Sequence, residues 1–302
     1  MTKPVHSEKN TSRVRKAASG VRKPAVRKTS ARRTSTGKHP KSKQKAVSRP
    51  MPAWVRWMVA VGLAVVLTVG FYWCFIRPYA YRWKPCYGLK GYGVCLPCSY
   101  DVHGIDISHY QGDIDWNLLA SQRAGEFPLR FVFLKATEGG DHGDDTFRAN
   151  FDSARAHGFV RGAYHYFIPR TDAIRQADFF IRTVQLQKGD LPPVLDVETT
   201  QGKSKADLQR AVKTWLDRVE HHYGVTPILY ASYKFKLRYL NDSIFQRYPY
   251  WIAHYYVDSV RYEGPWHFWQ HTDVGSVPGI EGNVDLNVFN GPMEGLDSLC
   301  LR

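Results

Sequence analysis

Two acidic residues, Asp196 and Glu198, form the pair in this sequence best suited to chemistry. They stand one residue apart in the segment PVLDVETT, directly after an apolar run. In a β-strand such residues point to the same face, about 6.6 Å apart along the backbone. Two carboxyl groups this close, in a site walled by aromatic residues, raise each other's pKa, so one can stay protonated near neutrality. A protonated acid beside a carboxylate suits cleavage of a glycosidic bond.

The alternative is a chance pair on a solvent-facing strand. Against it, the pair ends a predicted strand, and two further acids have similar places. Asp106 lies in the first predicted strand and Asp285 begins the last one, NVDLNVF. In β/α barrels the active site forms at the carboxyl ends of several strands, where these four acids would converge.

Aromatic residues in the neighbouring segments offer surfaces on which sugar rings could stack, although each is individually better explained as core. They are Tyr164, Tyr166, Tyr230, Tyr233, Trp251, Trp266 and Trp269.

The elements that must position these residues alternate between strands and helices, as in repeated βα units. Strands are predicted at 104–110, 130–137, 160–167 and 191–199, followed by TPILYAS, YWIAHYY, WHFWQHT and VDLNVF. Helical periodicity marks DDTFRANFDSARAHG, TDAIRQADFFIRTVQ and a helix from Ser204 to Gly224. The later strands leave little room for long helices. The pattern therefore predicts an irregular TIM-like α/β barrel rather than eight full repeats, and no internal repeat indicates a solenoid or propeller.

Charge divides the chain into two parts. The net charge is +15, and residues 1–50 hold 16 of the 42 Lys and Arg but a single acid, Glu8, which leaves 26 basic and 26 acidic residues elsewhere. The basic part also lacks aromatic residues, so residues 1–52 are predicted to be a disordered tail. The remainder is neutral, which argues against nucleic acid as the partner of the main domain.

A run of 19 uncharged residues follows, at 58–76, which as a helix would rise about 28 Å and could span a bilayer. Tryptophan and tyrosine flank it at both ends, as at membrane interfaces. A buried core helix and a cleaved signal peptide are the alternatives, but about 50 residues precede the run and no convincing cleavage site follows. We expect an uncleaved signal anchor at 53–77, with the basic tail cytoplasmic and the rest across the membrane.

Five cysteines fit that location: Cys74, Cys86, Cys95, Cys98 and Cys300. A disulfide is expected in the cluster just beyond the anchor, within a linker or small cystine-tied collar at 78–102, but its pairing stays open. The Cys-x-x-Cys at 95–98 could instead be redox-active or half of a metal site. No second pair at zinc spacing accompanies it, which disfavours that reading.

Seven motifs in order, GIDISHYQGDIDW, GAYHYF, PVLDVE, ILYASY, WIAHY, FWQHT and NVDLN, resemble the family 25 glycoside hydrolases, the muramidase-type lysozymes. The resemblance covers His103 to about Pro292, within a predicted catalytic domain at 103–302. It implies hydrolysis of the β-1,4 bond between N-acetylmuramic acid and N-acetylglucosamine in peptidoglycan, without cofactor or metal. It also suggests a bacterial cytoplasmic membrane for the anchor.

Carried over by motif, Glu198 is the general acid and base, Asp196 supports the charged intermediate, and Asp106 and Asp285 complete the acidic floor. Substrate-binding residues are expected at Tyr164, Tyr166, Tyr230, Trp251 and Gln270. Retention with participation of the substrate's acetamido group is favoured, and attack by a protein nucleophile stays open.

Two alternatives remain. The domain could be a catalytically silent peptidoglycan-binding module held at the membrane. The basic tail could be the functional element, contacting anionic lipids or nucleic acid, or it could only enforce topology.

Overall fold

The computed structural model describes residues 50–77, 86 and 89–302. The predicted disordered tail lies almost entirely outside the described residues and stays a prediction. One helical segment, α1 (Ala53–Phe71) continued by η1 (Tyr72–Ile76), spans 24 residues with a mean hydropathy of 2.3, and no part of its apolar window is buried. At about 1.5 Å per residue it is long and apolar enough to cross a bilayer.

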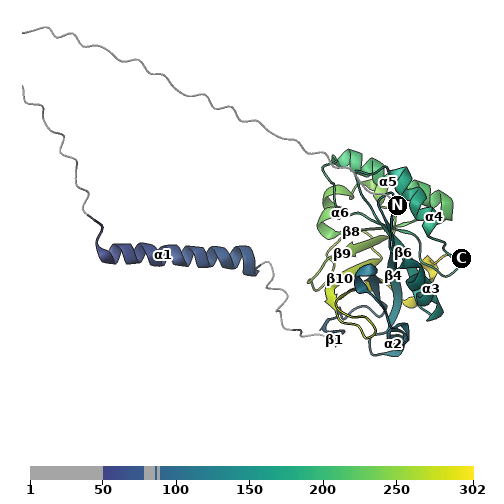
Figure 1. The fold of residues 1–302 in the computed structure, drawn as a ribbon, viewed down its shortest axis with the longest axis horizontal. Helices are drawn as coiled ribbons and strands as arrows, with labels where there is room; N and C mark the ends of the chain where they lie inside the picture. The colour runs from purple at the N-terminus through teal and green to yellow at the C-terminus, as the bar shows by residue number, and fades with distance from the viewer. Residues whose placement is uncertain (1–49, 78–85, 87–88) are drawn as a thin grey trace, which may run out of the picture. The chain divides into compact units, whose positions relative to one another are not determined.

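Eight strands close into a barrel (Figure 1). Around the barrel the order is β3, β11, β10, β9, β8, β7, β6 and β4, and a pairing between β3 and β4 closes it. All neighbours are parallel except β11, which is antiparallel to both β10 and β3. The bounds are β3 His103–Ile107, β4 Leu129–Glu138, β6 Val160–Tyr166, β7 Val194–Asp196, β8 Ile228–Ser232, β9 Tyr250–Ala253, β10 Phe268–Gly275 and β11 Val284–Phe289. A short strand, β5 (His142–Gly143), pairs antiparallel with the last residues of β4.

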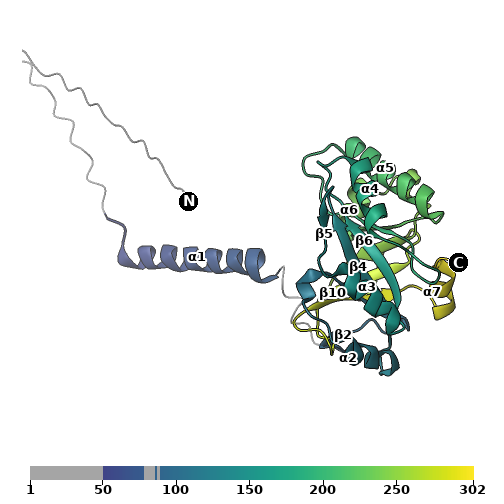
Figure 2. The same ribbon diagram turned by 45° about the vertical axis from the view of Figure 1, so that its right-hand side comes forward.

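Helices follow the first five barrel strands and the last one, and they surround the sheet (Figures 1 and 2). They are α2 Trp116–Ser121, α3 Phe147–Ala156, α4 Ala173–Thr183, α5 Lys205–Tyr223 and α6 Tyr233–Tyr239, and α7 Met293–Leu299 follows the last strand. No α-helix separates β9 from β10, and β10 and β11 form an antiparallel hairpin. The expectation of an irregular α/β barrel is confirmed.

Capping residues determine where α5 begins and ends. The Ser204 hydroxyl accepts a hydrogen bond from the Asp207 N–H at 3.1 Å, and Gly224 ends the helix with φ +67°, a conformation that glycine adopts without strain. Its inward face carries fully buried Val212 and Trp215. The predicted ends of this helix are confirmed.

Several predicted strands are shorter in the structure, and the sequence explains two of them. The strand predicted at 191–199 pairs only over Val194–Asp196, because the preceding residues 192 and 193 are prolines, which have no N–H to give to the sheet. The strand predicted at 104–110 ends at Ile107. There Ser108 begins a 3₁₀ turn, His109–Gln111.

Aromatic rings fill the interior of the barrel. Phe133 of β4 stacks on Trp251 of β9 with ring centroids 4.3 Å apart, and Phe268 of β10 meets Phe133 edge-on at 5.1 Å. A second, larger cluster lies between the strands and the surrounding helices. Large buried rings of this kind each contribute about 1.5–3 kcal/mol by leaving water, so the interior of the barrel is a packed core.

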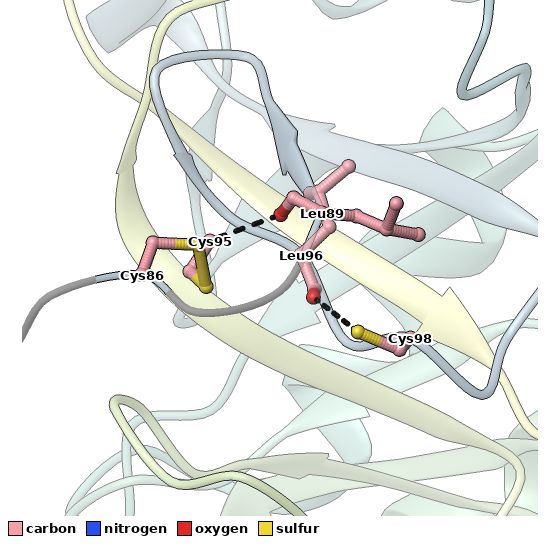
Figure 3. Close-up of a disulfide and its surroundings, with 5 residues drawn as sticks. All are labelled: Cys86, Leu89, Cys95, Leu96 and Cys98. Atoms are coloured by element: carbon pink, nitrogen blue, oxygen red, sulfur yellow. Dashed lines mark hydrogen bonds between the residues drawn. A yellow bond between two sulfur atoms is a disulfide. The ribbon is translucent and has the colours of Figure 1, made fainter.

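The described part of the segment before the barrel, Cys86 and residues 89–102, packs against the barrel as a small cystine-tied hairpin, and the rest of the predicted linker or collar at 78–102 lies outside the described residues. A hairpin of β1 (Lys90–Gly91) and β2 (Val94–Cys95) is joined to Cys86 by the Cys86–Cys95 disulfide (Figure 3). The Tyr92 hydroxyl donates to the Phe127 carbonyl at 2.7 Å, and Leu96 is buried in the larger core cluster. Apolar side chains among the Tyr, Pro and Gly residues make this hairpin part of the barrel domain.

That disulfide settles the pairing left open by the sequence. Because Cys95 bonds to Cys86, the neighbouring Cys98 is a free, exposed thiol rather than the other half of a Cys-x-x-Cys bridge.

Candidate active site

A cavity of about 240 Å³ opens at the carboxyl ends of the parallel strands. We call it the acidic cavity. All nine residues predicted from the sequence for the site line it, together with six others. The lining consists of Asp106, Ile107, Ser108, Tyr110, Gln111, Lys135, Tyr164, Tyr166, Asp196, Glu198, Tyr230, Trp251, Tyr255, Gln270 and Asp285.

Asp196 and Glu198 stand at different depths in this cavity. Asp196 is the last residue of β7 and only 7% exposed, whereas Glu198, two residues beyond the strand, is exposed at the mouth. The Val197 N–H donates to the Tyr230 carbonyl at 3.0 Å and keeps the backbone between them aligned with β8. Asp196 is therefore largely shielded from solvent at the base of the cavity, and Glu198 can exchange protons with solvent.

Their environments raise both pKa values. Burial raises the pKa of Asp196 well above its usual range, and the charges of Glu198 and Asp106 add to it. Burial also raises the pKa of Glu198, although hydrogen bonds from Tyr230 and Tyr166 offset part of the effect. Within the part of the chain that the structure describes, Asp196 Oδ1 is buried without a hydrogen-bond partner. That oxygen is free to accept a hydrogen bond from a ligand.

Asp106 and Asp285 form a second acidic pair on the cavity floor. They are directly opposite in the antiparallel register of β3 and β11, and their side chains hydrogen-bond to each other, which requires a shared proton. Burial, followed by the charge of Asp106, raises the pKa of Asp285, which therefore holds that proton. Asp106 Oδ2 accepts from the Asn287 amide at 2.7 Å and from the Gln270 amide at 2.8 Å.

Gln270 connects this floor to the aromatic wall. Its Oε1 accepts from the Tyr230 hydroxyl at 2.8 Å and from the Tyr255 hydroxyl at 2.7 Å, while its Nε2 donates to Asp106. The same Tyr230 hydroxyl lies 3.4 Å from Glu198 Oε1. Trp251 donates its Nε1–H to Asn287 at 2.8 Å. The network fixes the orientation of the carboxyl groups before any ligand arrives.

Lys135 supplies the positive charge of the cavity lining. It projects from β4 on the same face as Phe131 and Phe133, and its ammonium lies 2.6 Å from Glu138 and 5.2 Å from the centre of the Tyr166 ring. Its charge acts on Asp196 and Glu198 and lowers the pKa of each.

Comparison with known proteins connects this geometry to a family. The model of glycosyl hydrolases family 25 matches residues 105–280, from the second residue after the start of β3 to the loop before β11. The chain belongs to glycosyl hydrolase family 25. It is accordingly a glycoside hydrolase, and the family resemblance predicted from seven motifs is confirmed.

Relatives of this family 25 enzyme match most of its barrel domain. An uncharacterised protein of Escherichia coli K12, YegX, is 43% identical over 225 residues, covering 74% of this chain and 80% of YegX. Lysozyme M1 of Streptomyces globisporus is 34% identical over 205 residues, 63% of this chain and 68% of that protein. The solved structure of a family 25 glycosyl hydrolase from Bacillus anthracis superposes with a TM-score of 0.62 at 32% identity, over 68% of this chain and 95% of that one.

Three of the aromatic residues proposed as sugar platforms lie away from the cavity of this family 25 barrel. Trp269 is fully buried and donates to the His254 carbonyl at 2.8 Å. Tyr233 stacks flat on the His254 ring at 4.5 Å, and Trp266 packs beside Tyr100. Trp269 alternates along β10 with Phe268 and Gln270, which face the interior, whereas Tyr233 begins α6 and Trp266 precedes β10.

Several residues that line or support the site were not predicted from the sequence, among them Lys135, Tyr255 and Asn287. Lys135 lies in the apolar run RFVFLKAT and was treated only as part of that strand. Strand alternation with Phe131 and Phe133 places its side chain inside the barrel. Tyr255 and Asn287 are the last residues of the motifs WIAHY and NVDLN, in which only Trp251 and Asp285 were assigned to the site. Over the described residues, no group of three or more His, Cys, Asp or Glu side chains is arranged to hold a metal ion.

Proposed function

We propose that this family 25 hydrolase is a muramidase that cleaves the β-1,4 bond between N-acetylmuramic acid and N-acetylglucosamine in peptidoglycan. The observation that carries the proposal is the contrast between exposed Glu198 and buried Asp196 in one cavity. The similarity to Lysozyme M1 supports the substrate class.

Glu198 is the general acid in this proposal. Burial raises its pKa, so the proton needed by the departing sugar oxygen is held closer to neutral pH than on an ordinary glutamate. Its place at the mouth suits the second half of the reaction, in which the same group, now ionised, takes a proton from water. The hydroxyl of Tyr230 keeps one oxygen of Glu198 oriented.

Asp196 supports the positive charge that develops on the sugar. The substrate carries a 2-acetamido group whose N–H needs an acceptor, and Asp196 Oδ1 is a buried acceptor without a partner in the described chain. The carbonyl oxygen of that acetamido group attacks the anomeric carbon as the bond to the leaving sugar breaks, and Glu198 gives its proton to the leaving oxygen. Positive charge on the resulting ring favours the ionised form of Asp196. Water then opens this ring with retention of configuration.

The remaining cavity residues bind and orient the sugar. Tyr164, Tyr166 and Trp251 offer ring faces and edges, and the pair of Asp106 and Asp285 forms the floor. Gln270 hydrogen-bonds to Tyr230 and to Asp106, and Tyr230 lies between Gln270 and Glu198, so these two residues act by holding the wall and the carboxyl groups in place.

The direct test digests purified peptidoglycan with the full chain in mild detergent and reduces the products with borohydride. A muramidase leaves new reducing ends on muramic acid, which appear as reduced muramic acid. New ends on glucosamine would replace the proposal with a glucosaminidase. Binding of peptidoglycan without new ends would favour the silent binding module.

A proposal for location follows from α1 and the family. We infer that Ala53–Ile76 anchors the enzyme once in a bacterial cytoplasmic membrane, with the basic tail inside and the barrel outside, where peptidoglycan lies. The tail's 16 basic residues would enforce this orientation and could contact anionic lipid. Full-length protein should stay in the membrane pellet after alkaline carbonate extraction, and protease outside spheroplasts should digest the barrel. A soluble, shortened product would show cleavage after α1 instead.

Replacing Lys135 with methionine should move the pH profile of kcat/KM to higher pH. Loss of this charge raises the pKa of both Glu198 and Asp196. Because Glu198 must be protonated, activity then persists further on the alkaline side; because Asp196 must be ionised, activity is lost sooner on the acid side.

The matched variant Glu138→Gln removes the acid paired with Lys135 and should move the profile in the opposite direction, because the charge of Glu138 raises the pKa of Asp196. Equal losses at every pH in both variants would mean that the Lys135–Glu138 pair only packs the wall.

A further inference from the structure

Tyr110 stands out among the exposed side chains of the barrel domain. It is 81% exposed, whereas the other exposed large apolar side chains of the described barrel domain are aliphatic and 43–47% exposed: Leu89, Leu118, Ile174, Leu237 and Ile244. Its hydroxyl makes no hydrogen bond to any described residue, yet the residue lines the acidic cavity. Folding removes little of this ring from water, so its place in the cavity lining indicates a contact with a ligand.

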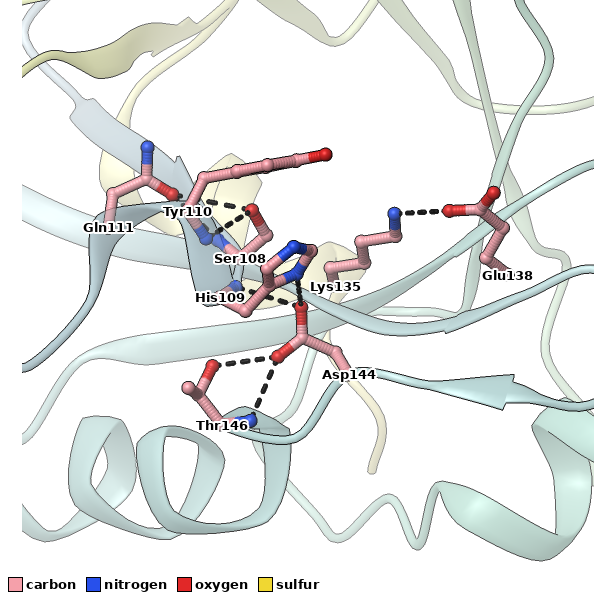
Figure 4. A network of polar contacts seen from close by, with 8 residues as sticks. All are labelled: Ser108, His109, Tyr110, Gln111, Lys135, Glu138, Asp144 and Thr146. Carbon is pink, nitrogen blue, oxygen red and sulfur yellow. Dashed lines mark hydrogen bonds and ion pairs between the residues drawn. The ribbon is translucent and has the colours of Figure 1, made fainter.

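The backbone beneath Tyr110 is unusually well fixed for an exposed turn (Figure 4). Ser108 and Gln111 form a reciprocal capping box, with the Ser108 N–H donating to Gln111 Oε1 at 2.9 Å and the Tyr110 N–H to Ser108 Oγ at 3.3 Å. The Gln111 amide also donates to the Asn283 carbonyl at 3.2 Å, which ties the turn to the loop before β11.

Buried Asp144 also holds the turn that carries Tyr110 in place. One of its oxygens accepts from the His109 N–H at 2.8 Å and from the His109 ring at 2.9 Å, and the other accepts from Thr146. Burial alone would raise the pKa of Asp144, but these hydrogen bonds hold it below its usual range, so the carboxylate is ionised and orients the His109 ring. That ring backs Tyr110, with centroids 4.1 Å apart. One face of Tyr110 is supported and the rest is open.

The size of the cavity indicates which part of a ligand would contact the exposed face of Tyr110. At about 240 Å³ it is smaller than the roughly 300–1,000 Å³ that encloses a whole small ligand, so a glycan strand must continue over the rim. We propose that Tyr110 is a stacking platform for a sugar ring of the strand outside the cleaved linkage, and that it sets a preference for long glycan strands. The proposal rests on the glycan-cleaving function proposed above.

The experiment separates binding from turnover. Full-length Glu198→Gln protein is titrated with soluble, peptide-free peptidoglycan strands, and the titration is repeated with Tyr110→Ala added. Loss of one aromatic stacking contact should weaken binding roughly 3- to 10-fold. Tyr110→Phe and Tyr110→Trp should bind like the parent, and Leu118→Ala, which removes another exposed apolar side chain, should change nothing.

With Glu198 restored, Tyr110→Ala should raise KM for octasaccharides and longer strands while leaving kcat unchanged. The unfolding temperature should match the wild type. Unchanged affinity for long strands, or an equal loss of kcat on short and long substrates, overturns the platform. A wild-type chain that binds strands but never cleaves them would instead overturn the proposed function, and the binding titration would still decide the role of Tyr110.

Discussion

The Glu198→Gln variant is expected to lose turnover of peptidoglycan by roughly 10²- to 10⁴-fold, the range that general acid–base catalysis contributes. Glutamine has the same shape and can still accept the hydrogen bond from Tyr230, but it has no proton to give to the leaving oxygen. Reducing ends released per minute measure the loss. Affinity for glycan strands should change little, because the contacts of the cavity wall remain.

The control for this variant is Glu281→Gln, which makes the same chemical change at an exposed position outside the acidic cavity. It should keep wild-type turnover. If Glu198→Gln also kept it, another acid would have to supply the proton, and the assignment of Glu198 would be wrong.

The Asp196→Asn variant should lose roughly 10²- to 10³-fold in kcat, comparable to removal of one preorganised electrostatic contact from an active site. An amide side chain carries no charge to oppose the positive charge on the sugar. The exposed Asp258→Asn serves as the matched control. A covalent sugar ester on wild-type Asp196, trapped with a slow substrate and found by mass spectrometry, would contradict the supporting role and make Asp196 the nucleophile.

The Asp196→Asn variant should lose activity without losing stability. The pKa of Asp196 is raised in the folded protein, so its ionised form is less stable there than in the unfolded chain. The carboxyl group therefore reduces stability as pH rises from its unfolded pKa towards its folded pKa, and asparagine removes that effect. The unfolding temperature at neutral pH should be at least that of the wild type, which shows an acid retained for activity at a cost in stability.

The fold was predictable where local chemistry decided it. Ser204 and Gly224 bracket α5 because capping depends on residues a few positions apart. The crowding of the last strands likewise indicated an irregular barrel. The antiparallel course of β11 was not predicted, since it depends on pairing with β3, nearly two hundred residues earlier in the chain.

The site was predictable from strand position and motif, and two of the residues missed there, Lys135 and Tyr110, were missed for the same reason. The four acids stand at strand ends, so their convergence in the cavity could be expected. Lys135 and Tyr110 were missed because each was assigned to its strand as a whole. Strand alternation would have placed Lys135 inside, and the Ser108-x-x-Gln111 capping pattern would have ended the first strand before Tyr110.

The most direct test of the central claim compares wild-type and Glu198→Gln full-length protein on the same purified peptidoglycan and counts new reducing ends on muramic acid. We expect the wild type to produce them steadily and the variant to produce fewer by at least about 10²-fold, with equal folding of both. Equal rates from the two proteins, or new ends on glucosamine alone, would contradict a muramidase that uses Glu198 as its acid.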